Sequence, residues 1–285
     1  MKPYRLHHNI NTDRAWERLH NRILNDKPAD SRAPNRRIAL RRLLPYAAAV
    51  VIAAAAFASW RLLSGGNADS RAELLLHNEQ GAATLVATLE DGSIVYLGEN
   101  TRLSYPTHFA AGERKVYLDG NAMFSVEANR ERPFRIATKR MTIEVTGTTF
   151  DVESNNNRLS VQHGQVKATT TAGNRRSVWV EAGQTARLAD GELAVTPTGD
   201  DRRLARYMQF LRFKDETLGN ILRVINSRGG DASISAAPAL ENLQITVTFA
   251  GNDSAENIAR LICNAFEWQL SQPAPHLFII APEAH

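Results

Sequence analysis

The residues that could do chemistry are scattered along this chain of 285 residues. Of the eight histidines only His7 and His8 are adjacent, and Cys263 is the single cysteine. The chain contains no G-x-x-x-x-G-K-[ST] string, which a phosphate-binding loop needs, and no H-E-x-x-H string, which a zinc-binding helix needs. It also contains no G-x-S-x-G string, which a serine nucleophile elbow needs. One cysteine also excludes an intrachain disulfide and a cluster of thiolate ligands. We therefore expect no enzyme, metal site or cofactor, and look for binding surfaces instead.

A hydrophobic run divides the chain. Residues 43–60 read LLPYAAAVVIAAAAFASW, without a charge, and Leu62 and Leu63 follow Arg61. At 1.5 Å per residue this run covers roughly 27 Å, close to a ~30 Å hydrocarbon core. Residues 1–42 hold eleven Lys/Arg against four Asp/Glu. The positive-inside rule then predicts one inner-membrane span at 43–63, with the N-terminus cytoplasmic and the C-terminus periplasmic.

Two other interpretations of the run remain open. Ala56-Phe57-Ala58 before Ser59 resembles a signal-peptidase site, although 42 residues are long for the segment before a signal sequence. A buried helix of a soluble protein is the second alternative, although such a helix normally has polar positions on one face.

The basic N-terminal segment contains an amphipathic pattern. Trp16, Leu19 and Ile23 recur at i, i+3 and i+7 after residues that can cap a helix, so they share one helical face. So short a segment buries little core, and we interpret the stripe as a surface for a protein partner. A helix lying on anionic lipid is the alternative. The basic residues lack a nucleic-acid fold signature, so we expect no direct nucleic-acid binding.

The pattern changes to period two from Thr84 to about Val195. Leu85, Ala87 and Leu89 alternate before an Asp91-Gly92 turn, and Ile94 and Tyr96 continue after it, as in a tight hairpin. Similar short strands follow without a helix-length segment between them. This predicts an all-β domain, either solenoid-like or sandwich-like.

A small α+β domain is predicted after Gln209. Strands and helices alternate, and LGNILRVI (218–225) resembles AENIARLI (255–262) at an offset of 37, which indicates a weak internal duplication. The chain is thus expected to be mainly β, with a cytoplasmic segment (1–42), a transmembrane helix (43–63), a juxtamembrane linker (64–83), an all-β domain (84–200) and an α+β domain (205–285).

Five strings follow one another in the β region: LEDGSIVYLGENTRLSYPTHF (89–109), RKVYLDGNAMFSV (114–126), RPFRIAT (132–138), IEVTGTTFDV (143–152) and EAGQTARL (181–188). In their order and spacing they resemble the FecR family of single-pass anti-sigma regulators. Thr101 and Asn121 depart from it, because serine and an acid are usual there. FKDETLGNILRVI begins a segment similar to the short domains of secretins and TonB-dependent transducers.

The resemblance implies a relay across the envelope. An outer-membrane TonB-dependent receptor loaded with substrate would contact the periplasmic part, and residues 1–42 would then change their hold on an extracytoplasmic-function sigma factor through Trp16, Leu19 and Ile23. Some family members cut themselves at a Gly-Thr bond, and Gly147-Thr148 matches that site.

The receptor is expected to add a strand to the C-terminal domain. We expect the segment with Ile245, Val247 and Phe249 to be the edge strand concerned.

Another class of function stays open, namely an envelope-anchored module that binds a glycan or an assembly partner and has no sigma partner. A periplasmic enzyme would need a pocket that sequence alone does not reveal. Neither the inducing substrate nor the sign of regulation can be read from the sequence.

Overall fold

The computed structural model describes residues 17, 20, 21, 73–173, 175–199, 202–230 and 232–283, with the side chains of 202–204 left out. The chain forms two compact units, 1–69 and 70–285. In the first unit Glu17, His20 and Asn21 are helical and exposed. The expected sigma-binding residues Trp16, Leu19 and Ile23 and the expected span at 43–63 lie outside the described residues. No helix within the described residues is long and apolar enough to cross a membrane.

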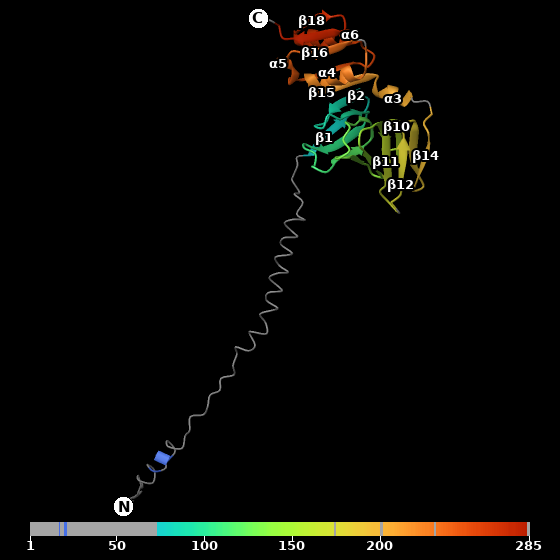
Figure 1. The fold of residues 1–285 in the computed structure, drawn as a ribbon, viewed down its shortest axis with the longest axis vertical. Coiled ribbons are helices and arrows are strands. Elements are labelled where there is room, and N and C mark those ends of the chain that lie inside the picture. Colours follow the sequence, from blue (N-terminus) through green and yellow to red (C-terminus); the bar gives the residue numbers. More distant parts are fainter. Residues whose placement is uncertain are drawn as a thin grey trace, which may run out of the picture. The chain divides into compact units, whose positions relative to one another are not determined.

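The second unit is mainly β, as predicted (Figure 1). Its first part consists of short strands joined mostly by tight turns. They are β1 (Glu73–Asn78), β2 (Thr84–Thr88), β3 (Ile94–Leu97), β4 (Thr101–Pro106), β5 (Arg114–Asp119), β6 (Asn121–Ser125), β7 (Phe134–Ala137), β8 (Met141–Val145), β9 (Thr149–Glu153), β10 (Arg158–His163), β11 (Gln165–Thr170), β12 (Ser177–Glu181), β13 (Gln184–Ala189) and β14 (Glu192–Pro197).

These strands form two sheets. The first sheet has the order β1-β4-β5-β7-β8-β11-β12, and the second has the order β14-β13-β10-β9-β6-β3-β2, extended by two later strands. Successive hairpins alternate between the sheets: β2-β3 belongs to the second, β4-β5 to the first, β9-β10 to the second and β11-β12 to the first. The domain is therefore layered like a sandwich while its chain advances like a solenoid, so each predicted architecture describes one aspect of it.

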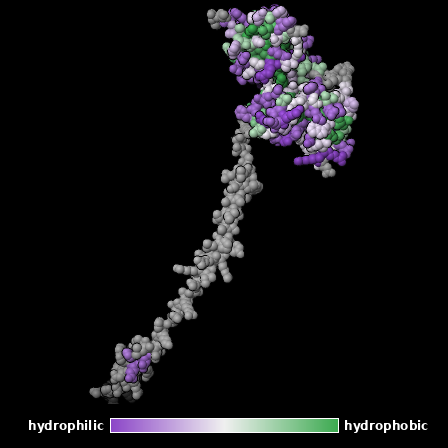
Figure 2. All heavy atoms as spheres, viewed as in Figure 1, coloured by the Kyte–Doolittle hydropathy of each residue, from purple (hydrophilic) through white to green (hydrophobic). Residues whose placement is uncertain are grey.

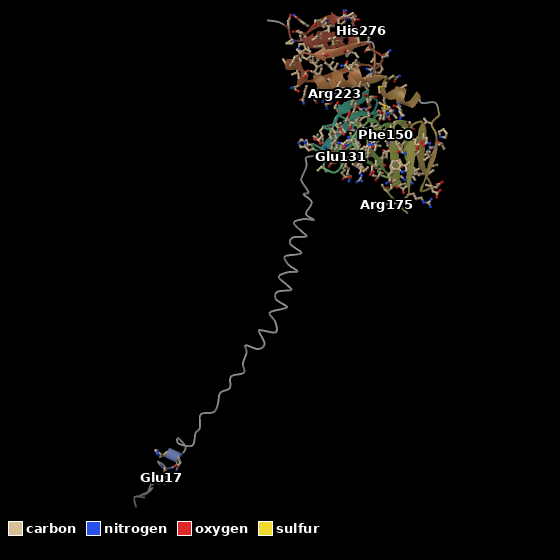
Figure 3. The ribbon with its side chains drawn as sticks, viewed as in Figure 1. Glu17, Glu131, Phe150, Arg175, Arg223 and His276 are labelled. Carbon is tan, nitrogen blue, oxygen red and sulfur yellow. The ribbon has the colours of Figure 1, made fainter. Side chains whose placement is uncertain are left out.

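Apolar side chains from both sheets fill the space between them. Phe124 and Phe150 stack with ring centroids 5.6 Å apart, and Phe134 lies 5.9 Å from Phe109 in an edge-on arrangement. Phe150 is fully buried, and Figure 3 places it among the strands of this domain. The core is continuous from Leu85 to Ala186, so the two sheets stabilise each other.

The C-terminal module follows a short connecting helix, α3 (Arg202–Tyr207). Its elements are β15 (Phe210–Thr217), α4 (Leu218–Ser227), β16 (Ser233–Ala236), α5 (Pro238–Glu241), β17 (Gln244–Ala250), α6 (Ala255–Phe266), β18 (Gln269–Ala274) and β19 (Leu277–Ala281). β16, β19 and β18 form a small third sheet. In Figure 2 apolar residues gather on the visible face of this module. The exposed large apolar residues of the module include Phe210, Leu243 and Leu261.

The predicted duplication is visible in the helix starts. Thr217 and Ser254, 37 residues apart, each cap a helix: Thr217 Oγ1 accepts from Asn220 N at 3.3 Å, and Ser254 Oγ accepts from Asn257 N at 3.2 Å. The paired residues Ile221 and Ile258 are both buried. Each half is thus a strand followed by a capped helix with the same buried face.

Two expected boundaries differ from the structure. Residues 73–78, expected in the linker 64–83, form β1 and pair with β4 along their whole length. The C-terminal module is also not separate from the β-domain, because β15 pairs in parallel with β2 and β17 pairs with β15. Both modules therefore contribute to one nine-stranded sheet. The sequence pattern of each strand shows its own periodicity but not which distant strand it joins.

A buried arginine holds the turns at one end of the β-domain. Arg114, 1% exposed, donates through Nη1 to Asp91 Oδ2 at 2.7 Å and to Glu127 O at 2.9 Å, and through Nε to Arg132 O at 2.8 Å. Asp91 Oδ2 also accepts from Ser93 Oγ at 2.7 Å. One guanidinium thus ties the β2–β3 turn to both ends of the loop between β6 and β7.

Replacing this arginine should destabilise the fold far more than replacing an exposed one. In Arg114→Met the Asp91 carboxylate and three carbonyls, those of Glu127, Asn129 and Arg132, lose a donor inside the protein, which should cost about 3–5 kcal/mol of unfolding free energy. Arg135→Met is the matched control, because Arg135 pairs with Glu113 and Glu144 but its side chain is 43% exposed, and its loss should cost about 1 kcal/mol or less. Urea unfolding measures both, and equal losses would contradict the assigned role of Arg114.

Candidate partner-binding surface

β17 lies at the edge of the nine-stranded sheet, where a partner strand can pair. The side chains of Ile245, Val247 and Phe249 are buried in the core of the module, and Phe249 stacks on Phe213 with centroids 5.6 Å apart. Thr246 and Thr248, between them, are exposed. The predicted receptor strand is therefore an edge strand whose three named side chains form core. Their receptor-binding role stays a prediction, and a partner would meet the main chain of β17.

A bulge in β15 limits the regular part of this edge. The pairing of β15 with β17 shifts between Phe213 and Glu216, and Asp215 has a φ of 50°. Asp215 N donates to Thr246 Oγ1 at 3.1 Å instead of continuing the ladder. Bulges increase local twist and discourage further pairing. The stretch of β17 beyond the bulge, from Val247 to Ala250, is thus the most regular part of the edge.

Glu216 connects the module to the β-domain. Its Oε2 accepts from Thr88 N at the end of β2 at 3.1 Å, and its Oε1 accepts from Asn220 Nδ2 in α4 at 2.8 Å. Burial, and secondarily the negative charge of Glu216, raises the pKa of Tyr105 on β4. Sequence reasoning missed this residue, because an acid just before a helix cap normally indicates only favourable charge at a helix start.

The connecting helix also binds the β-domain. Arg206 Nη2 donates to Glu153 Oε1 at 2.8 Å and to the Tyr207 hydroxyl at 3.3 Å. Tyr207 is 1% exposed, and burial raises its pKa to about 12. An aromatic residue at the end of the polar segment 200–206 was the sequence signal for this anchor.

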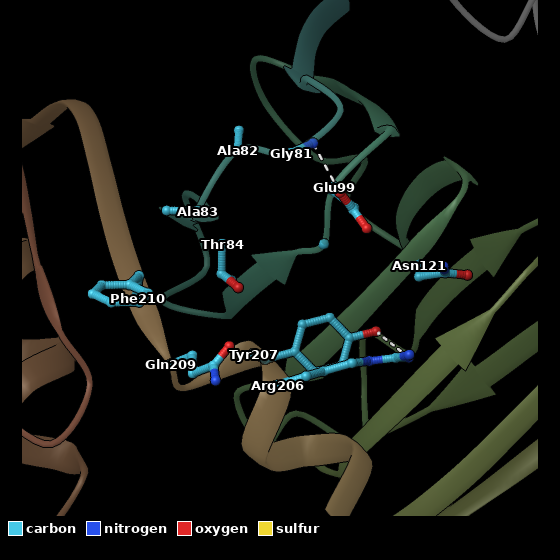
Figure 4. Close-up of a pocket in the computed structure, with 11 residues that line it drawn as sticks. Gly81, Ala82, Ala83, Thr84, Glu99, Asn121, Arg206, Tyr207, Gln209 and Phe210 are labelled. Carbon is cyan, nitrogen blue, oxygen red and sulfur yellow. Dashed lines mark hydrogen bonds between the residues drawn. The ribbon is translucent and has the colours of Figure 1, made fainter.

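A cavity of about 380 Å³ lies where the connecting helix meets the β-domain (Figure 4). Thr84, Asn121, Tyr207 and Phe210 are among its lining residues. Asn121 Oδ1 is buried without a hydrogen-bond partner in the described part of the chain, while Asn121 N donates to Thr101 Oγ1 at 2.9 Å. The two departures from the family pattern, Thr101 and Asn121, are therefore neighbours. Among the described residues, no cluster of His, Cys, Asp and Glu is suited to a metal ion.

Gly147 and Thr148 lie at a tight crossing of the chain. Gly147 has a φ of 151°, and a Cβ there would lie 2.9 Å from both Cα and Cβ of Ala128, so only glycine fits. Thr148 is buried, and its hydroxyl donates to Gln165 O at 3.0 Å. Packing thus accounts for the Gly-Thr pair, and the hydroxyl proton is directed to a neutral carbonyl and not to a base. Self-cleavage stays a prediction from the resemblance.

Comparisons with known proteins identify the central part of this unit. Residues 79–167 match the family model described as FecR protein. Two crystal structures of a candidate anti-sigma factor from Parabacteroides distasonis ATCC 8503, at 2.50 and 1.65 Å resolution, are each 19% identical to the chain. Each alignment covers 74% of this chain and all of that one, with a TM-score of 0.44. That likeness is too distant to carry an argument. No curated protein matches the chain.

The resemblance seen in the sequence is therefore confirmed over residues 79–167, which match the FecR family model. We use the name FecR domain for the two-sheet unit from β1 to β14 that contains these residues. The match begins just after β1 and ends within β11. It includes the buried Arg114, the Gly147-Thr148 crossing and Asn121, so the features above belong to the FecR part of the chain.

The buried tyrosine predicts a loss of stability at alkaline pH. The unfolded chain releases the Tyr207 proton near pH 10 and the folded chain near pH 12, so the unfolded state is favoured as the pH rises between these values. Two pH units correspond to about 3 kcal/mol. Urea unfolding at pH 9 and pH 11.5 should show a smaller loss for Tyr207→Phe than for the unchanged protein. Identical losses would contradict the burial of an ionisable hydroxyl here.

Proposed function

We propose that this protein is a single-pass inner-membrane regulator that relays the occupancy of an outer-membrane TonB-dependent receptor to an extracytoplasmic-function sigma factor. The FecR match over residues 79–167 is the observation that carries the proposal. The uncharged run at 43–60 and its basic flank support the topology, with residues 1–42 cytoplasmic and the FecR domain periplasmic. Trp16, Leu19 and Ile23 would contact the sigma factor, and the β17 edge would contact the receptor.

The shared sheet supplies a physical route for the signal within residues 70–285. A receptor strand added to β17 would be linked through β17 to β15, since β17 pairs with β15. β15 is in turn paired with β2 of the FecR domain. Glu216 and Tyr207 add side-chain links at the same junction. A ligand shifts an equilibrium only through a difference in affinity between two states. Strand addition would favour the state in which this junction is ordered.

We propose no catalytic role for the chain. A single transmembrane helix has no packed partner through which to pass a packing change, so a change of affinity or a cut made by proteases fits the topology best. The hydrogen bond from Thr148 to Gln165 O gives the hydroxyl a structural role. Purified protein that runs at full length on a denaturing gel would support this view, and a new N-terminus at Thr148 would show self-cleavage.

The sigma contact is tested by co-purification of the full chain with its sigma factor. Trp16→Ala combined with Leu19→Ala should weaken binding, because apolar anchors of this kind commonly contribute about 2 kcal/mol or more each. Glu17→Ala combined with His20→Ala is the matched control, since both residues are helical and exposed and lie next to Trp16 and Leu19 in the sequence. Equal binding by both double variants would refute the sigma contact. Co-purification with glycan or assembly partners alone would favour the alternative of an envelope-anchored binding module.

The receptor contact needs a substitution that leaves the shared core intact. Deleting residues 205–285 would uncover Val86, Tyr96 and Met123, which the module buries, so that deletion would damage the FecR domain as well. Thr248→Lys places a charge on the exposed face of β17 without entering the core, and charged edge residues discourage strand addition. We expect induction by substrate to be lost while circular dichroism is unchanged. Retained induction would place the receptor contact elsewhere.

A further inference from the structure

β1 forms the edge of the first sheet and, apart from Glu73 at its start, lacks the usual protection against pairing. All six residues of β1 pair with β4 without a bulge, and the strand ELLLHN contains neither lysine nor proline. Leu75 is 61% exposed and Leu74 is 39% exposed. Proteins normally blunt such edges with charges, prolines, bulges or a covering segment. An open edge with two exposed leucines therefore indicates a partner that covers it.

The strand is held firmly enough to serve as a template. Asn78 at its end is 1% exposed, and its Nδ2 donates to Leu97 O at 3.0 Å and to Ala83 O at 3.0 Å. At the opposite edge of the first sheet, β12 lies against β13 and β14 of the second sheet. Trp179 on β12 also has the Lys167 ammonium 6.0 Å from its ring. Of the two edges, β1 is the one that, among the described strands, packs mainly against its own neighbour β4.

The sequence of β1 is complementary to itself when two copies run antiparallel. With Leu75 opposite Leu75 of a second copy, Glu73 faces His77, Leu74 faces Leu76, and each pair occurs twice. Every cross-strand pair among residues 73–77 is then apolar with apolar or acid with histidine, the kinds of pair that stabilise antiparallel strands. Shifting the register by two residues would instead place Leu75 opposite His77 or Glu73.

This register also matches the two faces of the sheet. Leu76 packs against the core of the FecR domain, opposite Leu103 of β4. Leu74, on the same face, would meet Leu76 of the second copy and extend that core across the junction. Glu73, Leu75 and His77 would lie together on the outer face. A two-fold axis at Leu75 therefore gives complementary side-chain pairs on both faces of the joined sheet, as an interface between two identical surfaces requires.

We propose that a second copy of this chain covers β1, and that the two first sheets join edge to edge around a two-fold axis at Leu75. The protein is then a homodimer through its FecR domains. The β17 edge is left free in each copy. This inference does not depend on the identity of the sigma factor or of the receptor.

Cysteine cross-linking of the full-length chain in its own membranes tests this register. Opposed residues of antiparallel strands have Cα atoms about 4.5–5.5 Å apart, within the range that a disulfide bridges. Leu75→Cys should therefore give a disulfide-linked dimer on a non-reducing gel after mild copper(II) phenanthroline oxidation. Trp179→Cys is the matched control, because Trp179 is 58% exposed on the other edge of the same sheet. The unchanged chain, whose one cysteine is the buried Cys263, gives the background.

A charge exchange gives a second, independent readout. In the Leu75→Cys background, Glu73→Lys should lower the dimer yield about threefold to tenfold, because two cross-strand pairs lose their complementarity. Adding His77→Glu restores opposite charges at both pairs and should return most of the yield. Both side chains are exposed, so folding is preserved.

Three outcomes would overturn the proposal. The first is a yield for Leu75→Cys no higher than for Trp179→Cys. The second is a cross-linked product whose mass shows a different polypeptide, which would mean that another protein's strand covers β1. The third is a Glu73→Lys yield that His77→Glu does not restore, which would place the two strands in another register.

Discussion

The parallel pairing of β15 with β2 is the constraint on which the rest of residues 70–285 depends. It sets Leu211 beside Thr84 and Phe213 beside Val86, and thereby makes the second sheet common to both modules. Strands buried on both faces lose simple polar alternation. In β3 all four residues are buried: Val95 and Leu97 face the sandwich core, while Ile94 and Tyr96 face the core of the module. The FecR domain therefore has one of its faces completed by the C-terminal module.

This shared sheet connects the proposed receptor contact at β17 to the FecR domain, and it leaves the two proposed contacts on different sheet edges. β17 carries the exposed edge of the module, and β1 carries the edge of the other sheet. The contacts between the modules are partly charged, through Glu216 and through the pair of Arg206 with Glu153. Separating such a contact takes the opposite charge away from the more buried group, such as Glu153, which is costly. Binding at β17 would thus change the FecR domain first at this junction.

Local patterns predicted much of this structure. The Asp91-Gly92 hairpin, both capped helices and their 37-residue offset follow from turn chemistry and helical periodicity. The joining of β15 to β2 could not be predicted, because strands far apart in sequence carry no mark of their neighbour. For the same reason, the alternation of Ile94 and Tyr96 predicted a strand but not that both side chains pack into the core of the C-terminal module. Arg114 and Glu216 were missed as anchors, since a charged residue is normally exposed and only tertiary contacts show otherwise. Residues 1–16, 18, 19 and 22–72 lie outside the described residues, so the membrane span and the sigma contact stay predictions.

Native-state hydrogen exchange of residues 70–285 tests the central claim, that the FecR domain and the C-terminal module form one cooperative unit through the shared sheet. Amides in elements of one unit open with a common free energy. We predict that the protected amides of β15, near Leu211 and Phe213, exchange with the same free energy as those of β2 and β3, and that denaturant lowers them together. Exchange of β15 to β19 as a block at clearly lower free energy, with β2 and β3 still fully protected, would contradict the account.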